Sequence, residues 1–83
     1  MPYEVFFSPA ANEDIESLDP VAKKRLKKKM LFFLEDPLRY AKKLVGSKAG
    51  SYRWRVGDLR VIFDIKGGRL QIVRIGHRRE VYK

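Results

Sequence analysis

The sequence predicts an α+β fold, in which two helices form a layer on one face of an antiparallel, twisted sheet. Two observations predict it. Apolar residues recur at helical spacing over residues 8–34, and they alternate with polar residues over residues 52–75. The resulting order is strand, helix, helix, strand, strand, strand, and helices that precede a run of hairpins are typical of α+β domains. A chain of 83 residues has room for a single domain, residues 1–83, with a modest core.

The two helices each begin with a capping residue followed by proline. Residues 2–7 alternate as a first strand, after which Ser8-Pro9 predicts a short helix to Leu18. Asp19-Pro20 repeats the signal and predicts a second helix to about Leu34, which Asp36-Pro37 ends. The predicted core positions are Ala11, Ile15 and Leu18 in the first helix and Ala22, Leu26, Met30 and Phe33 in the second; Lys23, Lys24, Lys27 and Lys28 cover the opposite face of the second helix.

Three further strands are predicted over residues 52–56, 59–65 and 70–75. Gly57-Asp58 joins the first two as a two-residue turn with glycine in first place, which suits a type II′ hairpin. Gly67-Gly68 is a second tight turn. Simple alternation puts Val73 and Ile75 on one side of the last strand and Ile72 and Arg74 on the other. Residues 37–51 are predicted to be irregular.

The net charge of +9, with a pI near 10.1, favours a polyanionic partner. Nucleic acid is the first candidate; an anionic membrane or an acidic protein follows, and a merely solubilising surface is the alternative. The absence of cysteine excludes disulfides and thiolate zinc sites and fits the cytoplasm. The single histidine makes a protein-bound metal unexpected. No signal peptide or membrane-spanning run is predicted.

Arginines gather on one face of the predicted sheet. Residues two apart on a strand share a face, so alternation assigns to the open face Arg53, Arg55, Arg60 and Arg74, with Arg78 continuing past the last strand. Like charges facing each other destabilise a sheet, whereas the arginine fork binds phosphate oxygens in pairs. This face therefore predicts phosphate binding, with longer-range attraction from Lys23 and Lys27. The alternative is a solvated face, partly paired with Glu4 and Asp64.

Two residues near the C-terminal end can move a proton. By alternation His77 falls on the side of Val73 and Ile75, so it is either a partly packed histidine or an acid–base group. Tyr82 is either a hydrophobic anchor for the end of the chain or a catalytic group. The residues alone leave both alternatives open.

Several motifs resemble the RelE/ParE superfamily of type II toxin–antitoxin toxins over nearly the whole chain. They are Pro-Ala at the start of the first helix, Leu-Val-Gly at 44–46, YRWRVGDLRVIFDI and GHRREVY. The last two are the specific part, and they point to the RelE-like branch, whose members cleave mRNA in the ribosomal A site. A ParE-like inhibitor of DNA gyrase, or a non-catalytic RNA-binding module on the same fold, is the alternative.

The resemblance implies a role for each site residue. The ribose 2′-OH attacks the neighbouring phosphorus, with Tyr82 as general base, or His77 in its place. Arg60 holds the scissile phosphate, Arg78 or Arg79 acts on the leaving-group side, and the other residues expected to bind RNA are Arg53, Arg55, Arg74, Lys23 and Lys27. No cofactor is implied. The implied partners are a cognate antitoxin, the ribosome with its rRNA, and mRNA; the toxin is expected to be a monomer when free and a hetero-oligomer with its antitoxin.

Overall fold

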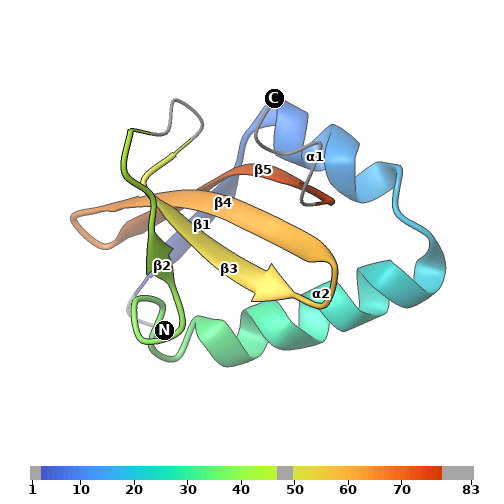
Figure 1. The fold of residues 1–83 in the computed structure, drawn as a ribbon, viewed down its shortest axis with the longest axis horizontal. Helices are drawn as coiled ribbons and strands as arrows, with labels where there is room; N and C mark the ends of the chain where they lie inside the picture. Colours follow the sequence, from blue (N-terminus) through green and yellow to red (C-terminus); the bar gives the residue numbers. More distant parts are fainter. Residues whose placement is uncertain (1–2, 47–49, 78–83) are drawn as a thin grey trace.

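A computed structural model describes residues 3–46 and 50–77 of the chain (Figure 1). The predicted Arg78, Arg79 and Tyr82 lie outside these residues. Within them the α+β class and the order of the predicted elements are confirmed. No helix of the described part is long and apolar enough to cross a membrane. The elements, in chain order, are β1 (Glu4–Phe7), α1 (Pro9–Glu16), α2 (Pro20–Phe33), β2 (Lys42–Lys43), β3 (Tyr52–Val56), β4 (Leu59–Lys66) and β5 (Arg69–His77).

The strands form one sheet in the order β1-β5-β4-β3-β2. β2 to β5 are antiparallel neighbours, but β1 pairs with β5 in parallel, so the predicted antiparallel sheet is in fact mixed. The two helices carry the chain from β1 to the opposite edge of the sheet, and the antiparallel strands then lead back to it. The region 37–51, predicted to be irregular, contributes the two-residue edge strand β2.

Both predicted helix caps are present. The Ser8 side chain accepts a hydrogen bond from the Ala11 amide at 3.0 Å, and the Asp19 carboxylate accepts one from the Ala22 amide at 2.8 Å. Pro9 and Pro20 follow at the start of each helix, where a missing amide hydrogen costs nothing. In α2 the predicted inward residues Leu26, Met30 and Phe33 are buried.

Helix α1 covers the part of β5 that β1 leaves unpaired. β1 is in register only with residues 69–72 of β5. Beyond them, the Ser8 amide donates to the Ile72 carbonyl at 2.9 Å, and the Ser8 hydroxyl donates to the Val73 carbonyl at 2.7 Å. The Ile75 amide donates to the Asp14 carboxylate at 2.8 Å. In Figure 1, α1 accordingly lies beside β5, where it satisfies an edge that would otherwise be exposed.

The core centres on Trp54, which is fully buried in β3. Its ring lies 4.2 Å from that of Phe63 and 5.2 Å from that of Phe33, measured between ring centroids. Its indole N–H donates to the Pro37 carbonyl at 2.9 Å, so the polar atom of the ring is satisfied as well. This contact joins α2, the turn that follows it and the sheet.

The two hairpin turns and a bulge set which residues share a face. Gly57 has φ of 59° and Asp58 has no positive φ, as a type II′ turn requires, whereas Gly67 and Gly68 both have positive φ. In β5, Arg74 pairs with Ile62 but Ile72 pairs with Phe63, so Val73 is an extra residue at a β-bulge. Ile72 therefore lies on the same buried side as Ile75, and the prediction that it faces the other way is wrong.

Candidate nucleic-acid interface

The predicted gathering of arginines is confirmed by the strand register. We call the residues Arg53, Arg55, Arg60 and Arg74 the arginine face. Arg55 of β3 pairs with Arg60 of β4, which pairs in turn with Gly76 of β5. Two residues further along β4, Ile62 pairs with both Arg53 and Arg74. Cross-strand partners point to the same side of a sheet, so all four side chains start from one face.

Arg60 is the fixed cation of this face. It is only 6% exposed, and one nitrogen of its guanidinium, Nη1, donates to the carbonyls of Gly57 at 3.0 Å and Leu59 at 3.1 Å. A buried charge is costly unless it is hydrogen-bonded, and these two carbonyls belong to the β3–β4 hairpin itself. The position of the Arg60 charge is therefore determined by the backbone of the turn.

Arg53 and Arg55 present more accessible charge beside it. Arg55 is exposed and Arg53 is half-buried. Because Arg55 stands directly opposite Arg60, two positive charges share one register position, which raises the electrostatic potential at that point. An anion with several oxygens, such as a phosphate, would relieve this repulsion and accept hydrogen bonds from both guanidinium groups.

Arg74 makes a structural contact as well as belonging to this face. Its Nε donates to Asp14 Oδ2 at 2.9 Å and its Nη2 donates to Asp14 Oδ1 at 3.3 Å. The hydrogen bond and the charge of Asp14 raise the pKa of Arg74 above its usual value. Since the same carboxylate accepts from the Ile75 amide, Arg74 helps to hold α1 against β5. The alternation of residues along the strands could not predict this contact, because Asp14 lies in α1.

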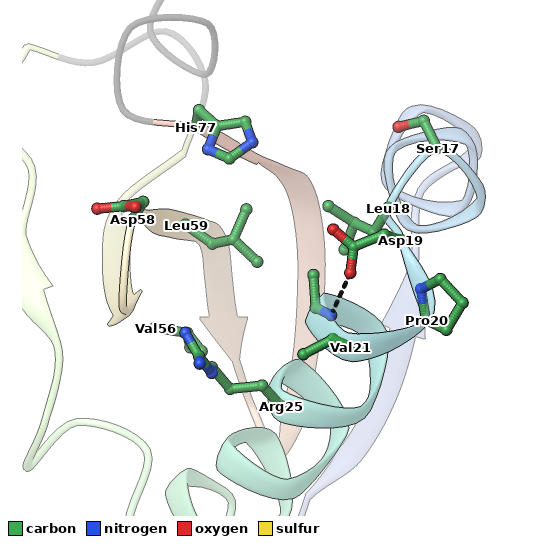
Figure 2. A pocket seen from close by; sticks show the side chains of 11 residues that line it. Ser17, Leu18, Asp19, Pro20, Val21, Arg25, Val56, Asp58, Leu59 and His77 are labelled. Atoms are coloured by element: carbon green, nitrogen blue, oxygen red, sulfur yellow. Dashed lines mark hydrogen bonds between the residues drawn. The ribbon is translucent and has the colours of Figure 1, made fainter.

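The structure does not bring His77 to the arginine face. His77 pairs with Leu59, whose side chain is buried on the helical side of the sheet, while the preceding Gly76 is the partner of Arg60. Figure 2 shows the His77 ring at a cavity of about 630 Å³ that also borders Asp58 and Arg25. His77 and Arg60 thus belong to opposite faces, as the alternation predicts, and a role of His77 in proton transfer stays a prediction.

Comparison with protein families decides the kind of protein. The family described as the ParE toxin of the type II toxin–antitoxin system, parDE, matches residues 5–82. The chain belongs to this toxin family. It is thereby a member of the RelE/ParE superfamily, as its motifs suggest. No curated protein sequence matches the toxin.

Several solved structures share the fold of this chain. The toxin resembles a chain of the toxin–antitoxin complex RelBE2 from Mycobacterium tuberculosis, with 28% identity and a TM-score of 0.82 over 94% of this chain and 100% of that one. It resembles a chain of the archaeal RelE–RelB complex from Pyrococcus horikoshii, with 23% identity and a TM-score of 0.76 over 96% and 99%. The corresponding values for YafQ from Escherichia coli are 19% and 0.76, over 98% and 99%. The last two likenesses concern the fold alone.

The predicted lysines of the toxin lie apart from its arginine face. Lys23 and Lys27 border an apolar groove of about 400 Å³ between β1 and the two helices, whose other lining residues are Val5, Phe7, Ile15, Leu26, Met30, Leu31 and Leu34. Arg25, by contrast, lies beside the hairpin that holds Arg60: a Cβ built on Gly57 would come within 3.2 Å of Arg25 Nη1. Arg25 is not among the site residues predicted from the sequence. Its spacing of three and four residues from Lys28 and Lys29, which places all three on one helix face, was the signal that could have identified it.

Proposed function

We propose that this toxin is an endoribonuclease that depends on the ribosome and cleaves mRNA in the A site. The observation that carries the proposal is the pairing of the fixed Arg60 with the exposed Arg55, beside Arg53, on one face of the sheet. Such a face is suited to a phosphodiester that gains negative charge as it reacts, because preorganised donors stabilise that charge without rearrangement.

The proposed reaction is an attack within the RNA strand. The 2′-oxygen bonds to the adjacent phosphorus and loses its proton to Tyr82, while Arg60 and Arg55 stabilise the charge on the phosphorane oxygens. The bond from phosphorus to the 5′-oxygen then breaks, that oxygen takes a proton from water and leaves as a 5′-hydroxyl, and the hydroxide so formed takes the proton that Tyr82 accepted from the 2′-hydroxyl. Arg78, or Arg79, stabilises the charge that develops there. The products are a 2′,3′-cyclic phosphate end and a 5′-hydroxyl end.

Tyr82 needs its surroundings in order to act as a base. A tyrosine hydroxyl has a pKa near 10 in its unperturbed state, and neighbouring guanidinium groups favour the ionised form. Arginine stays protonated up to about pH 12, so Arg53 and Arg55 supply charge and not a proton. Because general acid–base catalysis is weak here, the reaction depends on positioning of the reacting groups. In the best intramolecular cases positioning lowers the activation barrier by about 7–11 kcal/mol. The ribosome supplies this positioning in the proposal, and the net charge of +9 favours binding between strands of rRNA.

We further propose that the toxin, a monomer when free, is held by a cognate antitoxin. Two of the similar solved chains come from toxin–antitoxin complexes. The apolar groove between β1, α1 and α2 would accept the apolar side chains of a helical or extended antitoxin segment, while Lys23 and Lys27 at its rim would attract acidic residues. Leu31, which is 58% exposed in this groove, would then become buried.

The test is to add the purified toxin to a translating extract and to map new 5′ ends on the mRNA. We expect cuts at codons in the A site, and we expect Arg78→Ala and Tyr82→Phe to weaken them sharply. Equal cutting by Tyr82→Phe would refute the proposed base. Intact mRNA in the presence of active translation would refute the nuclease itself.

Inhibition of DNA gyrase is the second candidate function, because the matching family is described as the ParE toxin. The two candidates separate in one comparison. A gyrase inhibitor halts supercoiling of relaxed plasmid by purified gyrase and leaves mRNA intact, whereas the proposed nuclease cuts mRNA and leaves supercoiling unchanged.

A further inference from the structure

A basic stripe runs along the outer side of α2. Arg25, Lys28, Lys29 and Phe32 recur at helical spacing and together line a groove of about 420 Å³. The helix carries no acidic residue, so its six cations have no partner within the helix to pair with at a spacing of three or four. Like charges at such spacings destabilise a helix. These cations are Lys23, Lys24, Arg25, Lys27, Lys28 and Lys29.

An aromatic pair closes one end of this stripe. Phe32 is 51% exposed and Tyr40 is 42% exposed, with their ring centroids 5.0 Å apart. Both rings also contact the buried Phe33, at 6.0 Å and 5.6 Å, so the pair rests on the core. A cation lies over each ring: Lys29 Nζ is 5.8 Å from the centroid of Phe32, and Arg39 Cζ is 5.6 Å from that of Tyr40.

The other end of the stripe reaches the hairpin of the arginine face. Arg60 donates to the Gly57 carbonyl, and Arg25 approaches Gly57 Cα closely enough that a Cβ there would lie 3.2 Å from its Nη1. In Figure 2 the Arg25 side chain extends from α2 toward this end of the β3–β4 hairpin. The two basic surfaces therefore meet at one turn. Acidic residues flank this surface: Asp19 and Asp58 line the same cavity as Arg25, and Glu35 and Asp36 follow the helix in the chain.

We propose that the α2 stripe, Arg25, Lys28, Lys29, Phe32 and Tyr40, is a second RNA site, which binds a single-stranded segment with an unpaired base stacked on Phe32 and Tyr40. Aromatic faces that stack bases, beside cations that bind phosphates, are the common means of binding single strands. The ligand class rests on the proposed function. A protein segment fits the apolar groove on the other side of α2 better, since that groove is lined mainly by apolar side chains, whereas the stripe offers ring faces between cations.

The test measures binding of the full-length toxin to a fluorescent 2′-O-methyl RNA strand of about 12 nucleotides, by anisotropy at several salt concentrations. The 2′-O-methyl group prevents attack on the phosphorus, so binding is read separately from cleavage. Phe32→Leu keeps an apolar side chain without a ring face. Its matched control is Phe6→Leu, because Phe6 is a 42% exposed ring with Arg69 Cζ at 5.8 Å, far along the chain on β1. Lys66→Gln is the control for Lys28→Gln and Lys29→Gln.

We expect Phe32→Leu to raise the Kd about five- to tenfold, the effect of losing one stacked base, and Phe6→Leu to change it less than about twofold. Each lysine replacement in the stripe should reduce the salt slope by about 0.7, and Lys66→Gln should not. Equal Kd values for Phe32→Leu and Phe6→Leu would overturn the site even in an active nuclease. So would a Phe32→Leu variant that binds RNA normally but loses an antitoxin. A toxin that cuts no mRNA yet shows the expected differences would refute the proposed cleavage and keep the site.

Discussion

Arg55 and Arg60 face each other across the β3–β4 hairpin as direct cross-strand partners. Two like charges at one register position cost a sheet roughly 0.2–1 kcal/mol relative to a neutral pair. The two residues also differ: Arg60 is buried and held by carbonyls of the turn, whereas Arg55 is exposed. A pair that destabilises the free protein and would be relieved by an anion is better explained by binding than by folding.

Replacing Arg55 with glutamine should therefore stabilise the toxin and weaken its function. We expect the free energy of unfolding of Arg55→Gln to rise by about 0.5 kcal/mol, because the repulsion from Arg60 is lost. RNA affinity should fall and mRNA cleavage should fall with it. Urea denaturation, followed by circular dichroism, and the cleavage assay measure the two effects.

Lys66→Gln is the matched control for this prediction. Lys66 stands opposite Arg69 at the other hairpin, so it also belongs to a pair of like charges on neighbouring strands. It should give a similar stabilisation without loss of cleavage. If Arg55→Gln and Lys66→Gln lower cleavage alike, the arginine face has no special part in binding mRNA.

Arg60 should be the position least tolerant of lysine. Lysine keeps the charge but has no planar fork with which to donate to the Gly57 and Leu59 carbonyls while directing a second nitrogen to a phosphate. We expect Arg60→Lys to lower the cleavage rate on saturating ribosomes about 100-fold, as the loss of one preorganised donor does. Arg53→Lys, at a half-buried position that acts through its charge, should lower it less than about tenfold. Equal losses would mean that the geometry of Arg60 is unimportant.

Asp14 should matter more to stability than its partner Arg74. Asp14→Ala removes the ion pair and also leaves the Ile75 amide without its acceptor, whereas Arg74→Ala leaves that hydrogen bond in place. We expect a loss of about 1–2 kcal/mol for Asp14→Ala and less than about 1 kcal/mol for Arg74→Ala, whose side chain is 41% exposed. Asp14→Asn should fall between them because its amide oxygen still accepts from Ile75. The reverse order in urea denaturation would show that the ion pair dominates.

Much of this fold follows from local patterns. The Ser8-Pro9 and Asp19-Pro20 pairs set the helix starts, and strict alternation put Arg53, Arg55 and Arg60 on one face, because a tight two-residue turn preserves register between β3 and β4. The same alternation failed within β5, where the bulge at Val73 shifts the pattern by one residue. A bulge of this kind contains neither glycine nor proline to reveal it, so the side taken by Ile72 could not be predicted.

Contacts between distant segments were beyond prediction for a different reason. Asp14 and Arg74 are 60 residues apart, and their pairing depends on α1 lying along β5. The parallel pairing of β1 with β5 likewise depends on the number of antiparallel strands, β2 to β5, that bring the chain back from the far edge of the sheet to β1. The placement of Arg25 beside Gly57 requires the packing of α2 on the sheet. In each case the local helix or strand can be predicted from the sequence, but the contact depends on how two such elements pack together.

Gly50 should be required at the centre of the arginine face. A Cβ at this position would lie 2.7 Å from Cγ2 of Ile62 and 3.4 Å from the Phe63 carbonyl oxygen, and Ile62 is fully buried between Arg53 and Arg74 in the register. We expect Gly50→Ala to cost about 1–3 kcal/mol, as overpacking does, and to weaken RNA binding by moving these arginines. Gly67→Ala is the comparison: it has open space and a φ of 52°, so it should cost only the strain of a left-handed residue, about 1 kcal/mol, and leave RNA affinity unchanged. A Gly50→Ala toxin with normal stability and affinity would show that this segment yields without disturbing the face.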